Sequence, residues 1–118
     1  MLVAFSVSPS GVAPGDAAMP NSAPGAAADS VHDAVADAVR IVRESGLPNS
    51  TDSMFTTIEG EWDEVFDVIR RATEAVGRHG SRVSLVLKAD IRPGHTGEIT
   101  GKVERLEAAL ERQTPSSR

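Results

Sequence analysis

Apolar and polar residues alternate in two segments of the chain, which is the pattern of a half-buried β-strand. In residues 2–8 one face carries Val3, Phe5 and Val7, and the other carries Ala4, Ser6 and Ser8. In residues 82–91 the core face carries Val83, Leu85, Leu87 and Ala89, and the opposite face carries Ser84, Val86, Lys88 and Asp90. These two segments predict one strand near each end of the domain.

Three other segments have apolar residues at helical spacing. The first helix is expected to begin at Ser30 as its N-cap and to end at Gly46. The second opens at Glu61, ends at Gly80 and carries an apolar stripe of Trp62, Val65, Phe66, Ile69, Ala72 and Val76. The last helix carries Ile99, Val103, Leu106 and Leu110, a narrow seam typical of a helix that packs on one partner surface.

The remaining segments complete the expected order of elements. Residues 49–54 and 55–60 predict two short strands joined by a tight turn, and residues 9–29, rich in Pro, Gly and Ala, predict a flexible loop. The order is then βαββαβ followed by a helix, which predicts an α+β, ferredoxin-like sandwich with an extra C-terminal helix. We expect a single domain over residues 1–113 and a disordered tail over 114–118.

Helices cover only one face of such a sheet. On this interpretation the open face carries Ala4, Ser6, Ser8, Thr57, Glu59, Val86, Lys88 and Asp90. A half-apolar open face in a small domain is usually covered by a second copy of the chain. The sequence therefore predicts self-association.

Composition narrows the classes of function. The formal net charge is −5 among 118 residues, which argues against nucleic-acid binding because phosphates require a basic surface. The chain has no cysteine, which excludes thiolate catalysis and Cys-ligated zinc, and it has no apolar run long enough to span a membrane. The three histidines, His32, His79 and His95, are isolated in sequence, so we predict no metal site. A cytoplasmic location is expected.

The segment from Ser53 to Val65 is the most informative candidate for a site. It places Thr56, Thr57 and Glu59 at a strand end beside the positive end of a helix dipole, where a small polar ligand can be held. No general base accompanies a nucleophile in the sequence. The segment therefore predicts a binding module rather than an enzyme.

These residues also carry a family resemblance. Five pieces of the chain match one family pattern: the strand end Ser8-Pro9, the run Ser45-Gly46-Leu47, the run from Met54 to Glu61 with Thr56, Ile58 and Glu59, the pair Arg82-Val83, and the run from Leu87 to Arg92. On these pieces the chain resembles the small thiamine-binding family of ferredoxin-like proteins. The resemblance implies non-catalytic binding of thiamine or its hydroxymethylpyrimidine moiety by a homotetramer built as a dimer of dimers, with no cofactor. Phe55 departs from the family's sequence pattern, which more often has glycine at this position.

The candidate ligand-binding residues are Glu59, Thr56, Thr57, Ser8, Met54, Lys88 and Asp90. Each has a structural alternative. Glu59 could accept hydrogen bonds from an aminopyrimidine, or it could be a carboxylate at a helix start. Lys88 and Asp90 could form an ion pair or a subunit contact, Ser8 could serve close packing, and Met54 could fill a gap.

A function from another class stays open. The domain could be a protein–protein interaction or assembly module whose open face binds only itself or a partner protein and takes no small-molecule ligand. An apolar, fully occluded sheet face without a cavity would favour this alternative.

Overall fold

The computed structural model describes residues 1–12 and 26–113 of the chain. The elements follow in the order β1 (Leu2–Ser10), α1 (Ala26–Glu44), β2 (Asn49–Thr51), β3 (Thr56–Glu59), α2 (Trp62–Gly77), β4 (Arg82–Asp90) and α3 (Glu98–Gln113). The four strands form one sheet in the order β2-β3-β1-β4, and every neighbouring pair is antiparallel. The α+β, ferredoxin-like prediction is confirmed.

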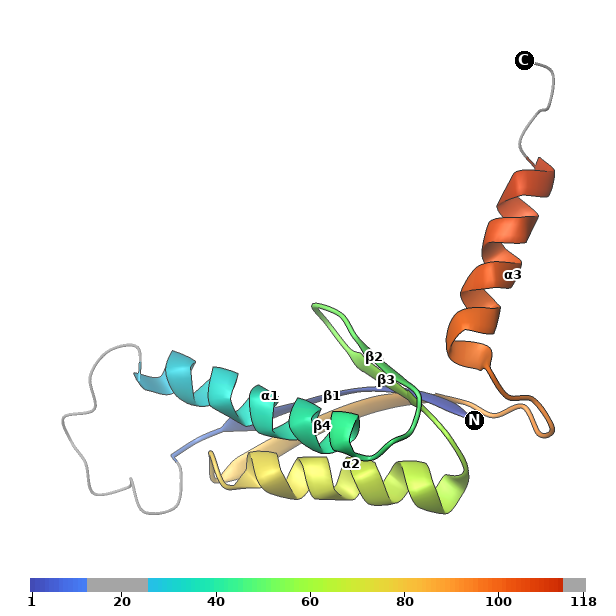
Figure 1. Ribbon diagram of the computed structural model, residues 1–118. Coiled ribbons are helices and arrows are strands. Elements are labelled where there is room, and N and C mark those ends of the chain that lie inside the picture. Colours follow the sequence, from blue (N-terminus) through green and yellow to red (C-terminus); the bar gives the residue numbers. More distant parts are fainter. Residues whose placement is uncertain (13–25, 114–118) are drawn as a thin grey trace.

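The core lies between the sheet and the first two helices (Figure 1). It contains aliphatic residues and one phenylalanine: Val3, Phe5, Val7, Ala34, Ala38, Val42, Ile58, Val65, Val68, Ile69, Ala72 and Val76. Small alanines on α1 and α2 let the helices approach each other and the sheet closely. The last helix, α3, projects away from this body and begins near the N-terminus of β1 (Figure 1).

The strand register confirms the two predicted faces of the sheet. Val3 lies opposite Ile58 and Phe5 opposite Thr56, on the buried side. On the other side Ala4 lies between Thr57 and Lys88. Ser6 lies opposite Val86 there, and Leu2 lies between Glu59 and Asp90, so the expected open-face residues do share one surface.

Several predicted boundaries were wrong. The first strand continues to Ser10, and the first helix begins at Ala26 rather than at Ser30, so both elements extend into the predicted 9–29 loop. Pairing with β4 continues as far as Ser10 opposite Arg82, which explains the longer strand. Residues 13–25 and the tail 114–118 lie outside the described residues.

Three predictions of burial were also wrong. Trp62 is 54% exposed and stacks on Phe66 at a centroid distance of 5.2 Å, outside the core, because it is the first residue of α2. Leu85 and Leu87 face the helices but are 41% and 38% exposed, because β4 is an edge strand. Val103 and Leu106 on α3 are more than half exposed, since α3 contacts the sheet chiefly at β3.

Candidate functional site

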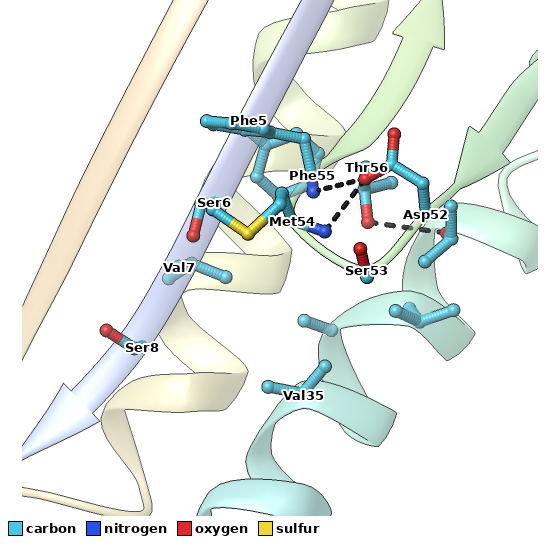
Figure 2. A pocket seen from close by; sticks show the side chains of 13 residues that line it. Phe5, Ser6, Val7, Ser8, Val35, Asp52, Ser53, Met54, Phe55 and Thr56 are labelled. Atoms are coloured by element: carbon cyan, nitrogen blue, oxygen red, sulfur yellow. Dashed lines mark hydrogen bonds between the residues drawn. The ribbon is translucent and has the colours of Figure 1, made fainter.

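A pocket opens where β1 continues beyond the start of β3. The β1–β3 pairing stops at Phe5 opposite Thr56, so from Ser6 onward β1 has a strand neighbour only on its β4 side among the described residues. The space left open has a volume of about 210 Å³. We call it the turn pocket; it is lined by Phe5, Ser6, Val7, Ser8, Val35, Ala38, Val39, Thr51, Asp52, Ser53, Met54, Phe55 and Thr56 (Figure 2).

The turn between β2 and β3 forms one wall of the pocket and is fixed by Asp52. The Asp52 carboxylate accepts hydrogen bonds from the backbone N–H groups of Met54, at 2.8 Å, and Phe55, at 2.9 Å (Figure 2). The Asp52 N–H in turn donates to the Phe55 carbonyl at 2.9 Å. These N–H donors hold the pKa of the Asp52 carboxyl below its usual value, so the group is ionised at neutral pH.

This rigid turn presents two apolar side chains to solvent beside the pocket. Met54 is 72% exposed and Phe55 is 36% exposed. Neither contributes to the core cluster. A turn that holds apolar side chains in place without burying them is a suitable rim for a pocket that binds a flat, apolar ligand.

The polar groups of the pocket come from hydroxyls and from the strand edge. Thr56 is nearly buried, and its hydroxyl lies 3.3 Å from the hydroxyl of Thr51. Half of the backbone N–H and C=O groups of an unpaired strand edge point outward, so Ser6–Ser8 offer main-chain donors and acceptors there. The pocket is therefore apolar with a few convergent polar groups, the usual composition of a small-molecule site.

Residues 19–107 match the family model described as thiamine-binding protein. This chain belongs to the thiamine-binding protein family. A UPF0045 protein of Mycobacterium bovis is 48% identical over 93% of this chain and 94% of its own length. A UPF0045 protein of Synechocystis is 32% identical over 70% of this chain and 69% of its own length.

Solved structures share the fold of this thiamine-binding family member. A DUF77 domain from Bacillus cereus superposes with a TM-score of 0.67 and 28% identity, covering 88% of this chain and 86% of that one. A protein of Thermotoga maritima provisionally assigned to thiamine biosynthesis or salvage superposes with a TM-score of 0.63. Its identity is 22%, over 89% of this chain and 96% of that chain, so this likeness speaks for the fold alone.

Three of the seven predicted site residues meet at the turn pocket, namely Ser8, Met54 and Thr56. The other four, Thr57, Glu59, Lys88 and Asp90, lie on the open face of the sheet. A ligand role for any of the seven stays a prediction. The geometry separates them into two groups, because the first three line the turn pocket beyond the start of β3 and the other four do not line it.

Glu59 holds the start of α3. Its side chain is 5% exposed, and its two carboxylate oxygens accept hydrogen bonds from the backbone N–H groups of Glu98, at 2.9 Å, and Ile99, at 3.3 Å. Gly97, which precedes the helix at a φ of 69°, has no side chain that could cap it. The structural alternative for Glu59, a carboxylate at a helix start, matches this geometry. The helix that Glu59 caps is α3 and not α2, which follows Glu59 directly in the chain.

Two ion pairs also involve the same helix. The Glu98 carboxylate accepts a hydrogen bond from Arg105 at 2.7 Å, which holds the pKa of Glu98 below its usual value. The Asp90 carboxylate pairs with Lys102 and likewise has a lowered pKa. Asp90 thus pairs with Lys102 of α3 rather than with Lys88, its neighbour on the same face of β4.

The sequence interpretation missed two features of the described residues. Asp52 was not singled out, although an aspartate that opens a short turn between strands is a recognisable signal. His79 was described as isolated, yet its Nε2 lies 2.8 Å from Asp37 of α1, a residue 42 positions away. The pKa of Asp37 is lowered, chiefly by this hydrogen bond. No group of three metal-ligating side chains occurs within residues 1–12 and 26–113, side chains of 26–30 aside.

Within the part of the chain that the structure describes, every helix is too short or too polar to cross a bilayer.

Proposed function

We propose that this protein binds thiamine or its hydroxymethylpyrimidine moiety in the turn pocket and releases it unchanged, as a cytoplasmic carrier, buffer or sensor. The observation that carries the proposal is the pocket itself: an apolar cavity, with polar groups at one wall, bounded by a turn that exposes Met54 and Phe55. Membership of the thiamine-binding protein family supports the choice of ligand.

The volume of the pocket favours one ring rather than the whole vitamin. An engineered apolar cavity of about 150 Å³ binds benzene, whereas pockets for drug-sized ligands span roughly 300–1,000 Å³. At about 210 Å³ the turn pocket suits a substituted pyrimidine. The pyrimidine would stack between apolar walls, and the thiazolium of thiamine would extend toward the mouth.

The polar groups suit the two parts of the ligand. An aminopyrimidine has both donors and acceptors, which match the Thr56 hydroxyl and the main-chain edge at Ser6–Ser8. The ionised Asp52 adds a negative charge at the turn, which attracts a thiazolium cation. Thr56, Met54 and Ser8 are the predicted residues that we propose to contact the ligand.

We propose binding without catalysis because the pocket offers no effective base. Asp52 is the carboxylate among the lining residues, and its lowered pKa makes it a weak proton acceptor at neutral pH. The hydroxyls of Thr51 and Thr56 face each other rather than a base.

Self-association belongs to the same proposal. The open face presents Val86, which is 58% exposed, beside the small residues Ala4 and Ser6. We propose that copies of this chain cover these surfaces in a dimer of dimers. An assembly module without a small-molecule ligand is the second candidate, and the same exposed surface favours it.

The test is isothermal titration of the purified chain with thiamine and with hydroxymethylpyrimidine. We expect heat with both, and Val35→Phe is expected to abolish it, because Val35 of α1 lines the pocket and a larger ring there fills it. Val31→Phe is the matched control: Val31 lies one turn earlier on α1, is equally exposed and does not line the pocket. Absence of heat with either ligand at millimolar concentration refutes the proposal and leaves the assembly module.

A further inference from the structure

The fixed charge of the turn pocket is negative. Of the 13 described residues that line it, Asp52 is the charged one, and none is a lysine, an arginine or a histidine. The sequence around these residues is equally poor in cations, because residues 1–39 and 49–59 contain neither lysine nor arginine. His32 of α1 is exposed and does not line the pocket. The pocket therefore offers no cationic side chain to an anionic ligand.

The charge of Asp52 is not neutralised within the part of the chain that the structure describes. No ion pair there includes this carboxylate. The backbone donors of the turn hold the pKa of the carboxyl below its usual value, so it is ionised at neutral pH. A carboxylate without a counterion repels an anion in the same pocket.

The same carboxylate occupies the backbone groups that a phosphate would need. Proteins also bind phosphate through N–H groups that converge at a turn or at a helix N-terminus. The N–H groups of Met54 and Phe55 converge in this way, but both donate to Oδ1 of Asp52, at 2.8 Å and 2.9 Å (Figure 2). The turn thus has the geometry of an anion site, and an anion of the chain itself fills it.

We propose that Asp52 makes the turn pocket selective for unphosphorylated ligands, so that it accepts neutral or cationic pyrimidines and rejects their phosphate esters. This inference rests on the proposed function and adds the class of ligand. The methylene carbon of the pyrimidine carries the thiazolium in thiamine and the phosphate in hydroxymethylpyrimidine phosphate. One position near the mouth of the pocket is therefore positive in the first ligand and negative in the second, and Asp52 attracts one and repels the other.

The expected selectivity is moderate. At about pH 8 a phosphate monoester carries close to two negative charges, because its second pKa is about 6. We define the selectivity ratio as the dissociation constant of hydroxymethylpyrimidine phosphate divided by that of hydroxymethylpyrimidine. We expect a ratio of at least about 10 for the wild-type chain. Because Asp52 is exposed, salt screens its charge, and the ratio should depend on ionic strength.

Titration calorimetry of Asp52→Asn at about pH 8 tests the role of the charge. Asparagine keeps an oxygen that accepts hydrogen bonds from the turn and removes the negative charge. We expect the substitution to tighten binding of the phosphate ester, to weaken binding of thiamine and to lower the selectivity ratio to about 3 or less. These opposite changes are diagnostic, because damage to the turn weakens the binding of both ligands.

Asp33→Asn is the matched control. It makes the same change of net charge on α1, the helix that lines the pocket, at an exposed residue that is not part of the lining. Two residues before Val35, it lies on the other side of a helix with 3.6 residues per turn. The selectivity ratio of this variant should equal that of the wild-type chain.

Ionic strength gives a second readout that needs no substitution. Raising it from about 10 mM to about 1 M shortens the Debye length from about 30 Å to about 3 Å. The selectivity ratio of the wild-type chain should therefore fall toward 1, and a ratio that salt leaves unchanged contradicts the proposal.

The remaining outcomes separate this proposal from the proposed function. Wild-type binding of the phosphate ester as tight as that of hydroxymethylpyrimidine overturns the selectivity and leaves ligand binding intact. An undiminished selectivity ratio in Asp52→Asn likewise removes Asp52 as its cause. Absence of heat with thiamine, hydroxymethylpyrimidine and the ester contradicts the proposed function and this inference together.

Discussion

The two ends of β3 are Thr56 and Glu59, three positions apart in the chain, and their polar side chains have different surroundings. At the start, the Thr56 hydroxyl faces another hydroxyl at the wall of the turn pocket. At the end, both carboxylate oxygens of Glu59 are occupied by the backbone of α3. A polar group with satisfied partners holds the fold, whereas one beside an open cavity can bind a ligand. The comparison indicates that Glu59 stabilises the fold, and we propose that Thr56 contacts the ligand.

The largest effect is expected from Glu59→Ala. It leaves the first N–H groups of α3 without their buried acceptor, which costs about 1–3 kcal/mol of unfolding free energy. Chemical denaturation measures the loss, and far-ultraviolet circular dichroism should report frayed helix. Glu107→Ala, an exposed change on the same helix, serves as the control and should be nearly neutral. Unchanged stability with weakened thiamine binding would return Glu59 to the site.

Thr56→Val is expected to lower affinity for hydroxymethylpyrimidine about fivefold, corresponding to one hydrogen bond of about 1 kcal/mol. The substitution keeps the shape and removes the hydroxyl. Thr57→Val changes the neighbouring residue on the open face and should bind as wild type. Titration calorimetry compares the two, and equal affinities for both variants would remove the Thr56 hydroxyl from the site.

Lys102→Met is expected to lower the melting temperature far less than Glu59→Ala does, because the pair of Lys102 with Asp90 is about half exposed to solvent. A small effect would identify the Glu59 cap as the main attachment of α3. Thermal melting of the variant beside Glu59→Ala is the measurement. A larger loss in Lys102→Met would make the surface pair the principal attachment.

The smallest effect is local and concerns the turn beside Thr56. Because N–H donors lower the pKa of Asp52, its bonds to the turn are intact above the ordinary Asp pKa of about 3.9 and are lost as pH falls through the lowered value. The amide resonances of Met54 and Phe55 should therefore titrate with a midpoint below about 3.9. Asp52→Asn should abolish this transition; a midpoint above 4 contradicts the account.

The alternation of residues predicted the fold well. The faces of β1 and β4 and the order of elements followed from side-chain period alone, because one sheet face is buried and fixes the register. Burial was less predictable. Leu85 and Leu87 were assigned to the right face, but the position of β4 at the border depends on the sheet order, which the period does not encode.

The sequence predicted the site only where the residues that form it are close together in the chain. Met54 and Thr56 belong to one short segment, and its turn chemistry is visible in the sequence. The partner of Glu59 lies 39 residues away, so its proximity to the start of α2 suggested the wrong helix. The contribution of α1 to the turn pocket depends on tertiary packing, and Val35 and Ala38 look like ordinary helix residues in the sequence.

The most direct test of the central claim is a backbone chemical-shift map of the full chain as hydroxymethylpyrimidine is added. The account predicts that the largest shifts fall on β1 residues 6–8, on the turn 52–55 and on Thr56. Small shifts are expected for Thr57, Lys88 and Asp90 on the open face. Shifts centred on those open-face residues and Glu59, with the turn unchanged, would contradict a site in the turn pocket.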